Sequence, residues 1–357
     1  MQTVSISVGV DVSKDSLAVY VERLATDRSI EKAGHRNFHN SGDGIEKLIT
    51  WITKKADGQP QLIHVAMEAT GRYHEPLAYI LFDHKVLTSI VLPNRIKNFA
   101  HSLNEYSKTD PIDARIIARY VTLHRPAAWS PVNKSMRQLR ELSRERQDII
   151  QMRTQAKCRC AALACGHKPP KKTLNRIKRQ VKLFDEQLAQ IEADMERLRQ
   201  QDEQLDKSVC LLSSIPHIGT TTAFTIIAET NDFQLFENRN QLIKYAGLDI
   251  IERQSGSSIM GRSKISKKGN SHLRTAPYMG TLSLGKTNSV FRQTYQRKIE
   301  QGYPKKSARI AVVRQLLQVA YGVHKSGLLY DENAHRSRLQ QEVGEPESSP
   351  TVAGSFA

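Results

Sequence analysis

The sequence predicts an α/β plus α fold class, in which an N-terminal domain with a mixed sheet precedes helical regions. Up to residue 92, short apolar runs typical of strands alternate with amphipathic stretches of helical period. Between residues 133 and 205 the strand signal disappears, and apolar residues recur at alternating spacings of three and four. This change of period predicts a sheet domain followed by a helical hairpin.

The N-terminal elements follow one another closely. Strands are predicted at residues 3–12 and 17–21 and near 36–39, because apolar side chains alternate there. A Ser-Gly-Asp-Gly run at 41–44 then starts an amphipathic helix. The remaining predicted elements are a strand at 62–67, a helix at 76–82, a strand at 87–92 and a helix that begins near Asp110.

Four carboxylates lie at the ends of these elements. Asp11 is on the first strand, Glu68 ends the fourth, and Asp110 and Asp113 start the helix after the fifth. A helix start alone explains the last pair, with Asp110 as N-cap and Asp113 as the third helical residue. Asp11 and Glu68 end apolar runs, where a charge is costly unless it is used. Together the four acids predict a site for Mg²⁺ or Mn²⁺, ions that assist phosphoryl transfer.

The net charge is the strongest global clue to a partner. The 357 residues carry a formal charge of +17, which favours binding to a polyanion. No apolar run approaches the roughly 18 residues that span a bilayer, and no basic segment leads into an apolar one at the N-terminus. We therefore expect a cytosolic protein that binds nucleic acid and no membrane.

The hairpin is predicted from a helix at about 134–164 and a heptad pattern from Leu174 to Leu198, separated by a break at 167–170. Seven basic residues and no acid occur between positions 168 and 182. A solvated helix face is the alternative to nucleic-acid contact, and we favour contact through Lys171, Lys172, Arg176 and Arg179. Cys158, Cys160 and Cys165 lack the usual spacing of zinc ligands, so buried thiols are favoured over a metal site.

The C-terminal part combines helices with one polar segment. Residues 210–228 resemble a helix-hairpin-helix, although His217 occupies a position that is usually Gly, and an ordinary helical hairpin explains them equally well. A serine-rich loop at 255–258 leads into a basic stretch, with predicted nucleic-acid contacts at Arg262, Lys264, Lys267, Lys268 and Arg274. Composition alone does not make any of these serines a nucleophile. Residues 275–330 are predicted helical, and the tail that follows disordered.

Eight short motifs, in order, resemble those of the insertion sequence 110 family of transposases, the bridge-RNA-guided recombinases. The motifs are Gly9-Val-Asp11-Val-Ser-Lys14, Glu68-Ala-Thr-Gly-Arg-Tyr73, Lys108-Thr-Asp110-Pro-Ile-Asp113-Ala-Arg115, Ser214-Ile-Pro-His-Ile-Gly219, Ala246-Gly-Leu248, Ser255-Gly-Ser-Ser258, Ser266-Lys-Lys-Gly269 and Tyr321-Gly-Val-His-Lys-Ser-Gly327. The resemblance covers roughly residues 4–330. The sequence departs from the family at His217 and at Asp249, where the family often has Pro.

The resemblance implies a domain organisation: an RNase H-like, RuvC-type domain at 1–130, a coiled-coil hairpin at 131–206, a transposase domain at 207–335 and a disordered tail at 336–357. It implies that Asp11, Glu68, Asp110 and Asp113 bind Mg²⁺ and that Ser255 forms a covalent phosphoserine link with DNA.

The resemblance also implies partners and a location. They are a structured noncoding guide RNA, donor and target double-stranded DNA, and a homodimer that assembles into a tetramer, in the bacterial cytoplasm with the nucleoid. Two competing functions remain: a RuvC-type nuclease that resolves junctions with water and the four acids, and a non-enzymatic nucleic-acid scaffold.

Overall fold

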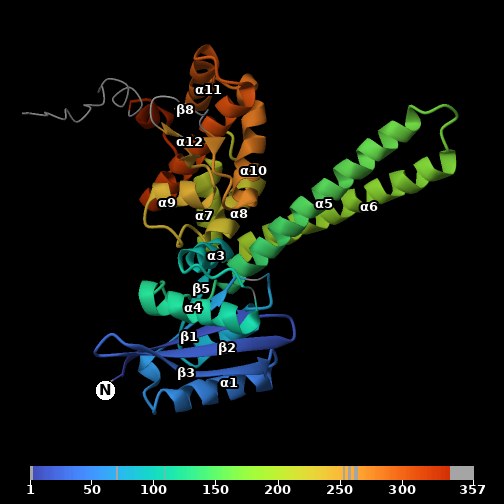
Figure 1. Cartoon of the computed structure of the whole chain (residues 1–357). Coiled ribbons are helices and arrows are strands. Elements are labelled where there is room, and N and C mark those ends of the chain that lie inside the picture. Colours follow the sequence, from blue (N-terminus) through green and yellow to red (C-terminus); the bar gives the residue numbers. More distant parts are fainter. Residues whose placement is uncertain are drawn as a thin grey trace, which may run out of the picture. The chain divides into compact units, whose positions relative to one another are not determined.

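A computed structural model describes residues 3–69, 71–107, 109–251, 254–255, 259–260 and 264–337 of the chain. The chain divides into two compact units, unit 1 at Met1–Pro131 and unit 2 at Val132–Ala357. Unit 1 contains the sheet and unit 2 is mostly helical (Figure 1). This confirms the predicted mixed α/β domain followed by a helical region.

The sheet of unit 1 has five strands in the order β3-β2-β1-β4-β5. The first three, β1 (Thr3–Val12), β2 (Ser16–Ala25) and β3 (Ile30–His39), pair antiparallel because short turns join them. The other two, β4 (Ile63–Glu68) and β5 (Leu87–Val91), run parallel to β1 and are reached through helical connections. The sheet is therefore mixed, with β3 at one edge.

Helices cover both faces of this sheet. On one face, α1 (Gly42–Lys55) and α2 (Glu75–Asp83) share an apolar core with buried side chains of β1 and β2. On the other, α4 (Asp110–His124) packs with α3 (Pro93–Ser102) and β4. Helix α3 was not predicted, because Ile96 is its single buried residue and leaves no helical period.

Unit 2 begins with two long helices, α5 (Lys134–Ala164) and α6 (Lys171–Gln201), which form the predicted hairpin. Every residue of the predicted heptad pattern in α6 is buried or half-buried. Two arginines interrupt the apolar pattern of α5, and each pairs with an acid of α6: Arg146 with Glu192 and Arg153 with Asp185, both with their closest atoms within 2.8 Å. The register of the hairpin is thus set by ion pairs as well as by apolar contacts; its supercoil remains a prediction.

The rest of unit 2 surrounds one apolar core. Its helices are α7 (Glu203–Ser213), α8 (Thr220–Thr230), α9 (Arg239–Tyr245), α10 (Ser271–Gly280), α11 (Val290–Glu300) and α12 (Lys305–Ser326). The segment predicted as a polar loop also contains paired strands: β6 (Ile250–Ile251) pairs with β9 (Lys264–Ile265), and β7 (Gln254–Ser255) with β8 (Ile259–Met260). We call the four strands β6–β9 the ribbon, and residues 264–270, from β9 to the N-cap of α10, the base of the ribbon.

The predicted tail at 336–357 lies outside the described residues from position 338 onward, and residues 336 and 337 have helical backbone. None of the helices in the described ranges has the length and apolar character needed to cross a membrane.

Candidate functional site

Two of the four predicted acids lie side by side on the sheet. In the parallel pairing of β1 with β4, Gly9 is opposite Ala66 and Val10 is opposite Met67. Asp11 and Glu68 are one residue further along the two strands. Because side chains alternate between the faces of a sheet, Asp11 shares its face with Gly9, and Glu68 shares its face with Ala66. Both acids therefore belong to the face that α4 covers, at the carboxyl ends of their strands.

Helix α4 crosses this face in direct contact with β1. A Cβ atom placed on Gly9 would lie 2.1 Å from the carbonyl oxygen of Ala114 and 2.3 Å from the amide nitrogen of Ala118. No side chain fits between the two backbones, which explains a glycine inside an otherwise apolar strand. Asp113 immediately precedes Ala114, so the acidic first turn of α4 lies at the Asp11 side of this crossing.

A buried ion pair fixes the direction of α4. Glu22 of β2 is 2% exposed and accepts two hydrogen bonds from Nε of Arg119 and a third, at 2.9 Å, from its Nη2. Glu22 pairs with Ser7, which precedes Gly9 on β1, whereas Asp11 follows Gly9. Helix α4 therefore runs from the Asp11 end of the strand toward the Ser7 end, with its N-terminal turn beside Asp11. The hydrogen bonds that Arg119 donates to Glu22 also raise the pKa of Arg119.

The start of α4 differs by one residue from the prediction. Thr109 has extended backbone and occupies the N-cap position, so Asp110 is the first helical residue and Asp113 the fourth. The Asp113 amide donates to the Thr109 carbonyl at 2.9 Å. Asp110 is therefore not the N-cap, and capping does not account for the pair; both carboxylates still lie where the helix dipole favours negative charge.

The donor set suits a hard divalent cation, because all four groups are carboxylates on backbone positions that converge. No three His, Cys, Asp or Glu side chains within the described ranges are arranged closely enough to hold a metal ion. Asp11, Glu68 and Asp113 each make a polar interaction inside the chain. The backbone thus brings Asp11, Glu68 and the acidic first turn of α4 to one face of the sheet, and Asp11, Glu68 and Asp113 each interact with other groups of the chain.

Ser255, the predicted nucleophile, belongs to unit 2. It lies in β7 opposite Ile259 of β8. At the base of the ribbon, a Cβ atom on Gly269 would lie 2.2 Å from the carbonyl oxygen of Tyr245, so this end of the segment is in backbone contact with α9. The Lys267 amide donates to the Gly247 carbonyl at 3.0 Å. Both ends of the segment that carries Ser255 are therefore held against the C-terminus of α9.

A second buried carboxylate supports this base. Glu229 of α8 is 1% exposed and accepts hydrogen bonds from Nε and Nη2 of Arg144 at 2.7 and 2.9 Å. The amide of Asn270, the N-cap of α10, donates to it at 2.7 Å. Burial opposes the charge, but the hydrogen bonds from Arg144 and Asn270 outweigh it, so the pKa of Glu229 is lowered. This network joins helix α5 to Asn270, the last residue of the base of the ribbon.

The predicted nucleic-acid contacts differ in how they are placed. Lys171, Lys172, Arg176 and Arg179 are exposed at the start of α6, and Lys264, Lys267 and Lys268 are exposed at the base of the ribbon. Arg274 is half-buried, and its Nη1 donates to the carbonyls of Ala246, Gly269 and Asn270. Arg274 therefore has a structural role whether or not it also contacts nucleic acid. Arg262 lies outside the described residues.

His217 occupies the turn between α7 and α8 with a φ of 70°, in the left-handed region that favours glycine. Its ring lies within 2.9 Å of Ser283 Oγ through Nδ1 and within 2.8 Å of Ser289 Oγ through Nε2. The Ser283 hydroxyl donates to the Gly280 carbonyl, so Nδ1–H donates to Ser283. Burial lowers the pKa of His217, which favours the neutral ring, and in that form Nε2 accepts from the Ser289 hydroxyl.

The cysteines were predicted to be buried thiols, and this is wrong. Cys158, Cys165 and Cys210 are exposed, and Cys160 is partly exposed. Cys158 and Cys160 lie in the last turns of α5, and Cys165 is its C-cap.

Comparisons with known proteins agree on one family. Residues 8–169 match a DEDD-type model described as a transposase, and residues 209–296 match one described as the transposase IS116/IS110/IS902 family. The pilin gene-inverting proteins of Moraxella bovis and Moraxella lacunata are each 29% identical over 300 residues, covering 84% of this chain and 91% of theirs. An uncharacterized 43.6 kDa protein of insertion element IS110 from Streptomyces coelicolor is 26% identical over 121 residues, 34% of this chain and 30% of its own.

Proposed function

The chain belongs to the IS110 family of transposases, which are DNA-rearranging enzymes, and we propose that it recombines DNA through a covalent phosphoserine link. One observation carries most of this proposal. Asp11, Glu68 and the first turn of α4 converge on the face of the sheet where α4 touches Gly9. Carboxylates on one face at the end of a sheet are what metal-assisted chemistry on phosphate needs.

In this proposal Asp11, Glu68, Asp110 and Asp113 are the residues that hold divalent metal. When bound, Mg²⁺ or Mn²⁺ stabilises negative charge on the phosphate oxygens and on the attacking and leaving groups. Elements of the chain position the carboxylates. Strands β1 and β4 carry two of them, and the ion pair of Arg119 with the buried Glu22 orients α4, which carries the other two.

Ser255 is the proposed nucleophile. Its Oγ forms a bond to phosphorus while the bond from phosphorus to one deoxyribose oxygen breaks. The serine proton passes to a base, and the departing oxygen takes up a proton, which leaves the DNA end linked to Ser255. In rejoining, a deoxyribose hydroxyl of a second DNA end attacks the phosphoserine, and Ser255 departs with a proton.

The proposed partners follow from the charge of the chain and from the resemblance to the family. A formal charge of +17 favours nucleic acid, and the basic residues at the start of α6 and at the base of the ribbon suit phosphates. We assign the choice of donor and target DNA to a structured guide RNA, which lets protein contacts go mainly to the backbone. The acids and Ser255 belong to different units, and in the proposed dimer of dimers one subunit's acids act with the Ser255 of another. The proposed setting is the bacterial cytoplasm, in association with the nucleoid.

A second function is supported by the location of the acids within one unit. All four belong to unit 1, so that unit alone holds the groups a RuvC-type nuclease uses to activate water. In that case Ser255 is dispensable and the products are free DNA ends.

Denaturing gel electrophoresis of end-labelled donor DNA, incubated with the protein, the RNA transcribed from its own element and Mg²⁺, separates the two functions. We expect a protein-linked DNA band with the unchanged protein and with the control Ser271→Ala, since Ser271 is an exposed serine at the start of α10. The band disappears in Ser255→Ala and in Asp11→Asn. Free cleaved DNA from Ser255→Ala, absent from Asp11→Asn, would establish the hydrolytic function instead.

A further inference from the structure

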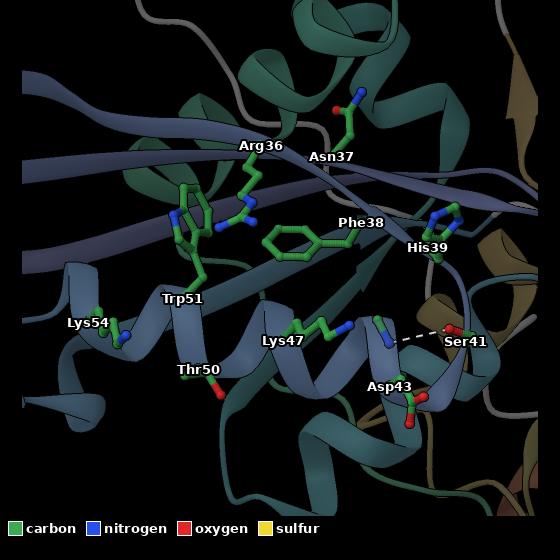
Figure 2. A pocket seen from close by; sticks show the side chains of 11 residues that line it. Arg36, Asn37, Phe38, His39, Ser41, Asp43, Lys47, Thr50, Trp51 and Lys54 are labelled. Carbon is green, nitrogen blue, oxygen red and sulfur yellow. Dashed lines mark hydrogen bonds between the residues drawn. The ribbon is translucent and has the colours of Figure 1, made fainter.

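Unit 1 also has a groove on the face of its sheet opposite the four acids, and this groove has no part in the proposed DNA recombination. It lies along the edge strand β3 and α1, on the face opposite α4, and has a volume of about 550 Å³ (Figure 2). Pockets of this size hold small ligands or a few units of a polymer. Its lining residues include Arg36, Phe38, Asp43, Lys47, Trp51 and Lys54.

The aromatic part of the groove is pre-arranged. The rings of Phe38 and Trp51 have centroids 5.7 Å apart, and the Arg36 guanidinium lies 5.3 Å from the centroid of Phe38. Figure 2 shows this guanidinium beside the two rings. Phe38 is buried, whereas Trp51 is half-buried, so part of the indole faces the groove. A flat guanidinium and an indole are surfaces on which a nucleobase stacks.

The charge of the groove is positive. Arg36, Lys47 and Lys54 are exposed, and within the described part of the chain none of them is in an ion pair. Lys47 and Lys54 lie two helical turns apart on α1, so their ammonium groups are spaced along the groove rather than gathered at one point. Spaced cations beside an aromatic surface fit a strand with repeating phosphates better than a single small anion.

One acidic residue of the groove favours RNA over DNA as the bound nucleic acid. Asp43 lines the same groove, two residues after Ser41, the N-cap of α1. A carboxylate repels phosphate, but it accepts a hydrogen bond from a hydroxyl, and the ribose 2′-OH is the hydroxyl that RNA has and DNA lacks. Bases within a duplex are stacked on each other and cannot reach an indole, so the strand is unpaired.

We propose that the groove between β3 and α1 binds an unpaired stretch of RNA. The base stacks on Trp51 and Arg36, the phosphates contact Lys47 and Lys54, and Asp43 accepts from a ribose hydroxyl. The site is separate from the four acids, which lie on the opposite face of the sheet. It rests on the proposed function only in taking nucleic acid as the partner.

The first test measures binding of a fluorescein-labelled ten-nucleotide oligouridylate to the full chain by fluorescence anisotropy, over a range of salt concentrations. Lys47→Gln/Lys54→Gln weakens binding and lowers the slope of log Kd against log salt by about 1.4, the value for two phosphates of a single strand. The matched control Arg28→Gln/Lys85→Gln removes two exposed charges of unit 1 that do not line the groove, and leaves the slope unchanged. An equal loss in both double variants overturns the proposal.

The second test reports stacking directly. The chain has two tryptophans, and Trp129 packs edge-on against Tyr79 and Phe82, so Trp129→Phe preserves a ring there and leaves Trp51 as the only tryptophan. Oligouridylate quenches the fluorescence of this variant, and Trp51→Leu weakens the anisotropy-measured affinity about tenfold. Absence of quenching overturns the proposal, and equal binding of oligothymidylate overturns the assignment to RNA. Because neither readout requires cleavage, both succeed or fail independently of the Ser255 experiment.

Discussion

The two parts of the proposed chemistry are held in different ways. In unit 1 the acids are on long elements, and α4 is set in place by backbone contact at Gly9 and by the buried Arg119–Glu22 pair. In unit 2 Ser255 is on a strand of two residues, and the contacts that locate it are at the base of the ribbon, around Gly269 and Asn270. The acids are thus positioned by the elements that carry them, and the serine by anchors some distance along the chain.

Gly9→Ala disrupts the backbone contact that positions α4 in unit 1. The added methyl group would lie 2.1 Å from a backbone oxygen of α4, and no rotamer change relieves that contact. We expect a loss of about 3 kcal/mol or more in the free energy of unfolding, above the usual cost of overpacking. Both tryptophans, Trp51 and Trp129, belong to unit 1, so urea titration followed by tryptophan fluorescence reports this unit.

Gly42→Ala is the matched control for this experiment. A Cβ atom on Gly42 meets nothing within 4 Å, so its urea midpoint should stay near that of the unchanged protein. If Gly9→Ala and Gly42→Ala unfold at the same urea concentration, α4 does not rest on β1 as described.

Replacing Arg119 and Arg144 measures how much each buried carboxylate, one in each unit, depends on its arginine. Arg119→Met leaves Glu22 with one further contact, the Thr122 hydroxyl at 3.4 Å, whereas Arg144→Met leaves Glu229 with Asn270 at 2.7 Å. We expect losses of about 2 kcal/mol and about 1 kcal/mol, below the value for a fully buried pair because both arginines are partly exposed. Tryptophan fluorescence follows the first variant and circular dichroism at 222 nm follows the second.

The pH dependence of Arg144→Met provides its control. The pKa of Glu229 is lowered in the folded protein, so the stability that its charge contributes is present above the unfolded value near 4.5 and is lost as the pH falls through the folded value. The difference between Arg144→Met and the unchanged protein should therefore narrow below pH 4.5. A difference that stays constant down to pH 3 would mean that Arg144 stabilises the fold by packing alone.

The same contrast explains what could be predicted from the sequence. Alternating apolar residues predicted the strands of unit 1, and Asp11 and Glu68 were predicted on two of these strands, which the structure pairs side by side. Gly9 inside its apolar strand is a sequence signal for a close backbone crossing such as that of α4. Glu22 was another, since an acid within a strand of apolar residues implies a partner.

The rest could not be predicted, because it depends on contacts between residues far apart in the chain. Strands of two residues have no period, so the ribbon resembled a loop, and a helix with one buried residue, α3, left no pattern. The Arg144–Glu229–Asn270 network joins three segments that carry no shared motif. The part of the site that rests on regular elements was visible in the sequence, and the part that rests on anchors was not.

His217→Gln tests the anchoring of unit 2 at the turn between α7 and α8. The glutamine keeps a polar side chain but loses the two-sided contact with Ser283 and Ser289, and we expect about 1 kcal/mol less stability at pH 7.5.

Because burial lowers the pKa of His217, the unfolded chain takes up the proton at a higher pH than the folded protein does. The unchanged protein therefore loses stability as the pH falls below about 6.5, and the loss ends below the folded pKa. The two proteins should converge between pH 7.5 and pH 5 in circular dichroism at 222 nm. His64, whose pKa is also lowered by burial, is present in both and cancels from the difference. A gap that widens toward pH 5 would show that the imidazolium, and not the neutral ring, is the form that holds the turn.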